Sequence, residues 1–272
     1  MKIRGYLKWT LIWGVGLLVI YLWCKSFLYE GSLEKFSSGV LNTTIIAFGS
    51  VLFASAIGWG VANFLIHVSH RYLKSSVHFL LEVLRSIPQI IGLLIGYICC
   101  VLYGVGSGWI LILFAFITSL VMFREMTDVL MDRYTYYKGY EFVQAGLVSG
   151  ISRVKLVNYE IFWKNCKAHI LNKMIGFFGT SIFLQTSVDY IISVGLSRNI
   201  NLIEYPTTLG NLLARSDSKQ DILAISRVFL NPAYIENIFF EHLQGVSIAL
   251  TIVFSLFCLH KIVNSYTRFH RL

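Results

Sequence analysis

Long apolar segments alternate with short polar segments along almost the whole chain. Six apolar segments stand out, at about 9–24, 39–68, 80–104, 109–123, 168–190 and 242–264. A helix needs about 20 mainly apolar residues to cross the hydrocarbon core of a bilayer, and most of these segments approach or exceed that length. The pattern predicts an all-α, polytopic membrane protein with about six transmembrane helices, in a single domain over 1–272.

Composition and charge support this interpretation. Hydrophobic residues make up 56% of the chain and charged residues 14%, whereas a typical soluble domain has about a quarter charged residues. The formal net charge of +9 does not indicate a nucleic-acid partner, because Lys and Arg lie between apolar segments rather than in a patch with aromatic residues. Lys2, Arg4 and Lys8 precede the first apolar segment as in a signal peptide, but no small-residue cleavage site follows it. We therefore expect an uncleaved first helix.

The distribution of positive charge predicts the orientation of the chain. With the N-terminus inside, the segments predicted to be external hold few basic residues, namely Lys25, Lys35, Arg198, Arg215, Lys219 and Arg227. The larger share of Lys and Arg falls in the segments predicted to be internal, as is typical of cytoplasmic loops. We expect both termini in the cytoplasm.

Two predicted loops are long enough to indicate a function of their own. The inner loop, at about 124–167, carries much of the predicted cytoplasmic charge and is expected to be largely helical. The outer loop, at about 191–241, is polar in places and contains Pro206 and Pro232. By contrast, the Gly-Val-Gly-Ser-Gly stretch at 104–108 is predicted to be a tight reversal, because no strand precedes it as a phosphate-binding loop requires.

Motifs that would indicate catalysis or a resident metal are weak. The sequence contains no GxxxxGK[ST], HExxH or GxSxG. His67 and His70 could ligate a metal, but interfacial anchoring is favoured because no third ligand adjoins them. Asn42-Thr43-Thr44 matches a glycosylation sequon, with helix N-capping by Asn42 or Thr43 as the alternative. Reduced packing residues are the favoured interpretation of the five cysteines, Cys24, Cys99, Cys100, Cys166 and Cys258, which form no CxxC.

Charged residues inside the apolar segments are expensive and therefore informative. Glu82 and Arg85 are three apart and are expected to pair on one helix face. Lys173 lies near the inner end of the fifth segment and is expected to snorkel toward the surface. Asp189, near the outer end of the same segment, has two interpretations: simple exposure at the interface, which is favoured, or a role in a substrate path.

The inner loop holds the most specific pattern in the chain. The stretch 141–163 reads EFVQAGLVSGISRVKLVNYEIFW, with an acidic residue, a small-residue pair and a glycine before a basic and apolar stretch. It resembles the EAA loop of ABC importer permeases, and in particular the D/E-Y-V-x-A-A-x-x-x-G-x-S pattern of the dipeptide, oligopeptide and nickel branch. Candidate ATPase-coupling residues implied by this resemblance are Glu141, Ala145, Gly146, Gly150, Ser152, Arg153 and Lys155.

Physical chemistry is consistent with that motif. Small residues such as Ala145 and Gly146 permit close approach of the backbone, and Gly150 can supply a left-handed turn that ends one helix and starts the next. In the family, this short helix docks on the ATPase, where Arg153 and Lys155 would contact acidic protein surface or lipid headgroups. The alternative is an ordinary amphipathic interfacial helix.

Other stretches match the same family in order. Leu41–Thr44, Leu84–Pro88, Ile191–Gly195 and Thr208–Leu213 resemble its successive short motifs, and Pro232 fits the proline before the last span, so the resemblance covers about 40–265. Pro88 is expected to kink the third span and is a candidate for the substrate pathway together with Asp189. Departures are Gly146 for the second alanine, Trp163 for a proline, Ser193 for a glycine and Thr186 for an acidic residue, with Asp189 at an apolar position.

The resemblance implies the fold and role of a type I ABC importer permease in a bacterial inner membrane. The implied partners are a second homologous permease, two P-loop ATPases, an extracytoplasmic solute-binding protein and membrane lipid. The chain itself would be non-catalytic and without a cofactor, with ATP and Mg²⁺ held by the ATPases. Peptides are the substrate class implied by the branch, with nickel or another metal chelate second.

Two other classes of function remain as alternatives. A stand-alone channel or secondary transporter would need inverted repeats or paired broken helices, and the sequence shows no internal symmetry. A membrane-embedded enzyme would need His, Asp or Glu clustered at membrane depth, and no such cluster is visible in the sequence.

Overall fold

Every element that the structure describes is a helix. The structure is a computed structural model, and it describes residues 5–102, 107–195, 206–214, 216–240 and 243–270. The long helices are α1 (Gly5–Phe27), α2 (Glu30–His67), α3 (Arg71–Ser86), α4 (Gln89–Leu102), α5 (Ser107–Tyr137), α8 (Lys167–Gly195) and α12 (Leu243–His270). The shorter ones are α6 (Glu141–Val148), α7 (Arg153–Lys155), the π-helix η1 (Leu156–Asn165), α9 (Leu209–Ala214), α10 (Ser216–Leu230), the 3-10 helix η3 (Pro232–Tyr234) and α11 (Ile235–Phe240).

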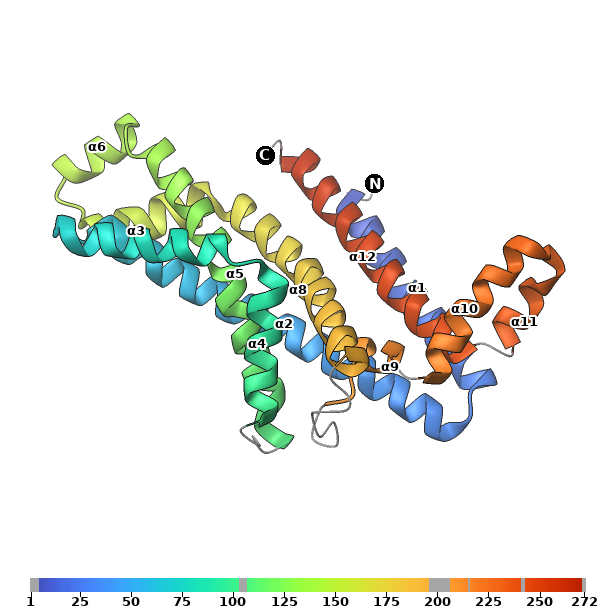
Figure 1. The fold of residues 1–272 in the computed structure, drawn as a ribbon. Helices are drawn as coiled ribbons and strands as arrows, with labels where there is room; N and C mark the ends of the chain where they lie inside the picture. The colour runs from blue at the N-terminus through green and yellow to red at the C-terminus, as the bar shows by residue number, and fades with distance from the viewer. Residues whose placement is uncertain (1–4, 103–106, 196–205, 215, 241–242, 271–272) are drawn as a thin grey trace.

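The long helices form an elongated bundle with two distinct ends (Figure 1). The start of α1, the end of α12 and α6 lie at one end, which we call the α6 end, and α9 lies toward the other, the α9 end. The rings of Tyr6 and Tyr266, 5.4 Å apart between centroids, hold the two terminal helices together at the α6 end. The prediction that both termini lie on the same side is thus consistent with the fold.

Five of the described helices are long and apolar enough to cross a membrane: α1, α2, α5, α8 and α12. The bent pair of α3 and α4 raises the number to six if it counts as one span. This confirms an all-α chain compatible with a multi-pass membrane protein. Two boundaries differ from the prediction, because α2 already begins at Glu30 and α5 continues to Tyr137. At 1.5 Å per residue, the 38 residues of α2 extend well beyond a hydrocarbon core of about 30 Å.

The third predicted span, 80–104, is wrong as a continuous helix. The chain turns by 92° between α3 and α4, at Ile87 and Pro88. Ile87 is extended, with φ −82° and ψ 121°, as expected for a residue whose α conformation is blocked by the following proline ring. The backbone oxygen of Pro88 then accepts from Ile91 N at 3.0 Å, which starts α4. The chain thus bends at Pro88, as predicted, but the bend is a break between two helices rather than a kink within one helix.

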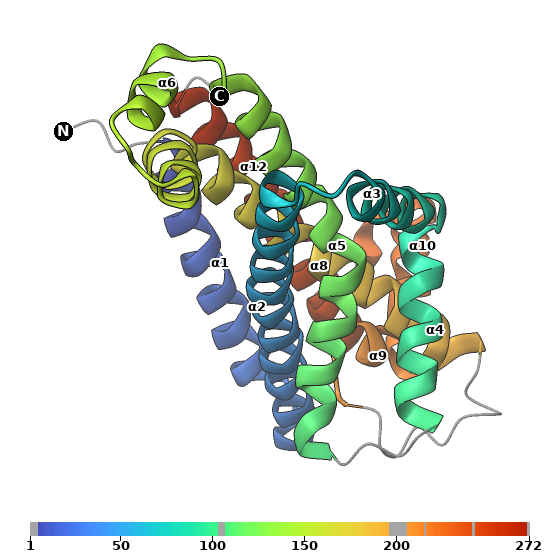
Figure 2. The same cartoon turned by 90° about the vertical axis from the view of Figure 1, so that its left-hand side faces the viewer.

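The core lies among α2, α4, α5 and α8. Figure 2 shows α2 and α5 side by side, and an added Cβ at Gly58 of α2 would lie 2.8 Å from the backbone oxygen of Phe123 in α5. Ser50 Oγ donates to Ser181 Oγ at 2.7 Å and so joins α2 to α8. Small residues and interhelical hydrogen bonds of this kind hold helices together where lipid gives no hydrophobic driving force between them.

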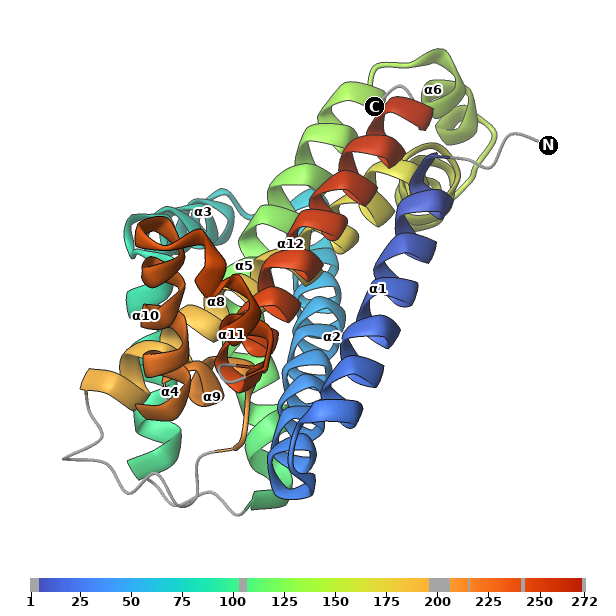
Figure 3. The ribbon, with the colours of Figure 1, turned by 90° about the vertical axis from the view of Figure 1, so that its right-hand side faces the viewer.

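The first helix is peripheral and packs against the last. Figure 3 shows α1 beside α12, and Trp13 Nε1 donates to Ser255 Oγ at 3.1 Å across this pair. Cys24 is the one buried residue of α1, whereas Leu11 and Val15 stay 60% and 61% exposed. Exposure of this kind on an apolar helix is expected where lipid surrounds it.

The described part of the predicted outer loop after α8 forms short helices, of which α9 lies toward the α9 end. The described segment 206–214 packs against α2, where Asn42 Nδ2 donates to the backbone oxygen of Thr207 at 2.8 Å and Leu209 N donates to Thr43 Oγ1 at 3.0 Å. The prediction that Asn42 or Thr43 caps a helix is wrong, because both residues lie inside α2. The tight reversal predicted at 104–108 lies largely outside the described residues.

Candidate functional site

The segment singled out by the sequence forms a compact helical unit at the α6 end. We call residues 141–165 the coupling segment, after the role that the sequence resemblance predicts for it; it comprises α6, α7 and η1. Its largely helical character is confirmed, although residues 124–137 of the predicted loop belong to α5. In Figures 1 and 2 the α6 helix of this unit lies at the edge of the molecule, at the same end as the end of α12.

Gly150 closes α6 with the backbone geometry that the sequence predicted. Its φ is +80°, in the left-handed region, and Gly150 N donates to Leu147 O at 3.1 Å. Ile151 N donates to Gly146 O at 3.0 Å, and together these two bonds form a Schellman motif. Glycine suits this position because the left-handed conformation costs other L-residues free energy. The turn sends the chain into α7.

Gly146 and Ala145 differ in their surroundings. Gly146 is buried, and a Cβ added to it would collide with Leu156 Cδ1 at the end of that side chain, so α6 packs closely on η1 at this point. Ala145 is exposed, and its backbone oxygen accepts from Ser149 N at 2.9 Å. Within this chain the Leu156 side chain packs closely on Gly146, and the predicted close approach of a partner's backbone stays a prediction for both residues.

The inner side of the coupling segment belongs to the main core. Val143, Leu156, Val157, Ile161 and Phe162 are all at most 4% exposed and belong to the cluster that continues into α2, α5 and α8. The coupling segment is thus packed into the same core that joins the long helices.

The outer side of the coupling segment is apolar and exposed. The exposed apolar side chains of its first half are Phe142, Leu147, Val148, Ile151 and Val154, and Tyr159 and Trp163 of η1 are exposed as well. Val148 is 90% exposed, so it is nearly as accessible as in an extended chain. Glu141, Ser152 and Lys155 are also exposed around these residues. An exposed apolar patch rimmed by polar residues is typical of a protein or membrane contact.

Two polar contacts tie the coupling segment to the long helices. Asn158 of η1 and Asn63 of α2 form reciprocal amide hydrogen bonds of 2.8 and 2.9 Å, and Trp59 Nε1 donates to Asn158 Oδ1 at 2.8 Å. Arg153 Nη2 donates to Tyr134 OH of α5 at 2.8 Å. Sequence reasoning missed the role of Asn158, although a polar residue within an otherwise apolar turn of the motif was a signal. Arg153 makes this bond and is still exposed, so its expected outward contact stays a prediction.

The pKa values of two groups are shifted here, Lys164 at the end of the coupling segment and Cys166 just after it. A hydrogen bond from Lys164 Nζ to Glu160 Oε2, 3.0 Å long, raises the pKa of Lys164. Burial raises the pKa of the Cys166 thiol, between η1 and α8, to about 11. Cys166 is therefore a neutral packing thiol at physiological pH. All five cysteines are free, but Cys99 is exposed and does not pack as predicted.

Charges beneath the coupling segment form two ion-pair groups. Glu82 is 3.9 Å from Arg85, as predicted, but its nearer partner is Arg124 of α5, at 3.3 Å. Lys173 does not snorkel as a lone cation, because its Nζ lies 2.6 Å from Glu125 Oε2. The other Glu125 oxygen accepts from Gln89 Nε2 at 3.1 Å, so Glu125 connects the start of α4 to α8 through α5.

Asp189 is not exposed, contrary to the favoured interpretation. Its side chain is fully buried where α8 meets α9, and Thr208 Oγ1 donates to Asp189 Oδ2 at 2.5 Å. The same Thr208 oxygen accepts from Asn211 N at 3.2 Å, and an added Cβ at Gly210 would lie 2.7 Å from Asp189 Cβ. Asp189 thus anchors the segment that precedes and begins α9. Pro88, the other pathway candidate, directly precedes α4, at the bend between α3 and α4.

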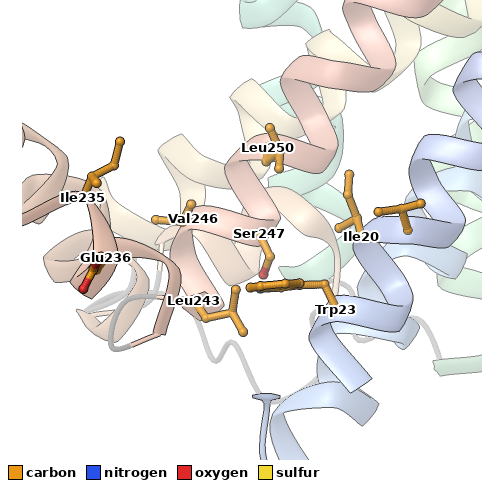
Figure 4. Close-up of a pocket in the computed structure, with 9 residues that line it drawn as sticks. Ile20, Trp23, Ile235, Glu236, Leu243, Val246, Ser247 and Leu250 are labelled. Atoms are coloured by element: carbon orange, nitrogen blue, oxygen red, sulfur yellow. The ribbon is translucent and has the colours of Figure 1, made fainter. Parts of the chain in front are cut away.

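Metal ligation by the histidines gains no support from the described residues. His67 Nδ1 lies 2.8 Å from Asn63 O, and no group of three potential ligands forms in the part of the chain that the structure describes. A cavity of about 490 Å³ lies elsewhere, between α1, α11 and α12 (Figure 4). Apart from Glu236 and Ser247 its lining is apolar, as shown by Trp23 and Leu243, so it offers few polar groups for a solute.

A comparison with known protein families finds none that matches the chain, and no curated protein matches it either.

Proposed function

We propose that the chain is the permease subunit of a bacterial ABC importer, and that the coupling segment docks on a cytoplasmic ATPase. The observation that carries the proposal is the construction of this segment: an exposed apolar face that includes Val148 lies over a side buried in the helix core. The hydrogen bonds from Asn158 to α2 and from Arg153 to α5 link the exposed face to long helices. A force applied to the face would reach the bundle directly.

The remaining parts of the proposal follow from the resemblance of the sequence to the dipeptide, oligopeptide and nickel branch. The chain would form half of a translocation path together with a second permease, and an extracytoplasmic protein would deliver the solute at the α9 end. Peptides are the proposed substrate class, with metal chelates second. The chain would lie in the plasma membrane with both termini and the coupling segment in the cytoplasm, and would carry no catalytic residue.

A stand-alone carrier is the alternative with some structural support. Carriers of that class use broken helices in pairs, one in each repeat. The α3–α4 pair, bent by 92°, is one such break, and the described residues hold one bent pair. The exposed face of the coupling segment has no use in that mechanism, and we therefore favour the importer.

A matched pair of substitutions tests the proposal. Val148 and Tyr29 are 90% and 89% exposed, at the α6 end and between α1 and α2 respectively, so a new glutamate at either disturbs little packing. We expect Val148→Glu to lose a P-loop ATPase when the tagged chain is purified from its native membrane in mild detergent. Tyr29→Glu should retain the ATPase. Equal recovery with both variants, or no ATPase with the unsubstituted chain, contradicts the proposal.

A further inference from the structure

Two cavities adjoin one another between α5, α8 and α12. The first, which we call the polar cavity, has a volume of about 360 Å³ and is lined by Asp132 and Arg133 of α5 and by His169, Asn172 and Lys173 of α8. The second, the apolar groove, has a volume of about 370 Å³ and continues toward the α9 end between α8 and α12. Gly176 and Val263 line both, so the two spaces meet.

The polar cavity contains a cation without a partner carboxylate. Arg133 is half-buried, and among the described residues no carboxylate lies within 4.0 Å of its guanidinium. The lysine of the lining, Lys173, is paired with Glu125 at 2.6 Å, and Asp132 is exposed. His169 lies close enough to Arg133 to be affected by its charge. A partly desolvated guanidinium favours an anion beside it, and phosphate matches its donor geometry.

The lining of the apolar groove is mainly apolar and suits a hydrocarbon chain. Ile175, Leu256 and Leu259 line it together with Gly176 and Gly179, and its polar members are Thr180 and His260. An added Cβ at Gly176 would meet nothing within 4 Å, so the missing side chain leaves open space. Both α8 and α12 are long and apolar enough to cross a membrane, so the groove runs along the direction in which lipid chains lie.

We infer that a phospholipid binds between α5, α8 and α12, with its phosphate beside Arg133 and an acyl chain in the apolar groove. The two cavities call for a ligand with a charged end and an apolar end that meet near Gly176. A soluble phosphate compound would use the polar cavity alone, and an uncharged lipid the groove alone. Basic pockets between transmembrane helices hold lipid headgroups by the same chemistry. This inference does not depend on the proposed role in an importer.

Three probes separate these ligands on the purified, delipidated full chain. Native mass spectrometry would measure the fraction of chain that retains phosphatidylglycerol, diacylglycerol or glycerol 3-phosphate at equal concentrations. The first carries both phosphate and acyl chains, the second lacks the phosphate and the third lacks the chains. We expect retention of phosphatidylglycerol well above the other two. Equal retention of diacylglycerol or of glycerol 3-phosphate overturns the inference.

Two substitutions test the two halves of the site separately. Arg133→Gln should weaken phosphatidylglycerol binding by about tenfold or more, the effect expected from losing one charge-assisted hydrogen bond. Lys164→Gln removes one exposed positive charge at the same end and should leave binding unchanged. Gly176→Leu should fill the groove and also reduce binding, and its thermal unfolding shows whether the fold is intact. Binding unaffected by Arg133→Gln, or reduced as much by Lys164→Gln, contradicts the inference.

Discussion

Replacing Gly150 tests whether the coupling segment depends on its left-handed turn. Gly150 has φ +80°, and an added Cβ would meet no atom within 4 Å. The cost of Gly150→Ala is therefore a backbone cost alone, about 1–2 kcal/mol for an L-residue in this region. Asparagine tolerates the left-handed region better, so Gly150→Asn should cost less than alanine. The order expected for stability of the segment is Gly, then Asn, then Ala.

Hydrogen exchange of the α6 amides measures this cost locally. A loss of about 1–2 kcal/mol raises the open fraction, and hence the exchange rate, about 5- to 30-fold. The increase should be confined to residues 141–150, because the long helices retain their own hydrogen bonds. The measurement is made on the purified chain in detergent, with backbone amides followed by mass spectrometry.

A second glycine supplies the control for this experiment. Gly139 lies just before α6, has no positive φ, and likewise has no atom within 4 Å of an added Cβ. Gly139→Ala should leave exchange in α6 unchanged. The reasoning is refuted if Gly150→Ala exchanges like the unsubstituted chain, or if Gly139→Ala has the same effect as Gly150→Ala.

Three further predictions concern the helix core, the α9 end and a buried thiol. Gly58→Ala should lower thermal stability in detergent by about 1–3 kcal/mol, because its Cβ would lie 2.8 Å from a backbone oxygen of α5. Gly60→Ala on the same helix, where an added Cβ meets nothing within 4 Å, should leave stability unchanged. Equal effects of the two substitutions would contradict the packing described. Asp189→Ala should lower the free energy of unfolding by about 1–3 kcal/mol and speed proteolysis near α9. Asp189→Asn keeps an acceptor for Thr208 and should be cleaved more slowly than Asp189→Ala. Identical cleavage of the two variants would argue against the anchor. A chain retaining only Cys166 should resist maleimide at pH 8 until unfolded, because burial holds the thiol neutral with a pKa of about 11. Since this pKa is raised from 9.0, the thiol's contribution to stability is complete below pH 9 and is lost as the pH rises toward 11, and denaturant titrations at pH 8 and 10.5 would measure the loss.

Periodicity and length predicted most of the helices but not how one of them breaks. The apolar segments locate α1, α2, α5, α8 and α12 because a span must satisfy its own backbone hydrogen bonds within a helix. The start of α2 and the end of α5 were placed too far inward, since both helices continue into polar sequence beyond any hydrocarbon core. Pro88 was expected to bend the third span, but the size of the bend, 92°, depends on tertiary packing that the sequence does not display.

Local geometry of the candidate site was predictable and its long-range contacts were not. Gly150 shows its role in sequence, because a glycine after a short amphipathic helix is the usual signal of a left-handed cap. Gly146 was expected to allow close approach, and Leu156 is the residue that approaches. By contrast, Asn63 and Asn158 are far apart along the chain, and no local pattern indicates that their amides pair. Asp189 was misjudged for the same reason, since Thr208 lies on another segment.

Photo-crosslinking from position 148 in the native membrane tests the central claim most directly. A photoreactive amino acid replaces Val148, and the same substitution at Tyr29 serves as the control because its exposure is the same within one percentage point. After irradiation, mass spectrometry identifies the crosslinked partner. The account predicts a P-loop ATPase joined to position 148 and not to position 29. Crosslinks from position 148 to lipid alone, or to no ATPase, would contradict it.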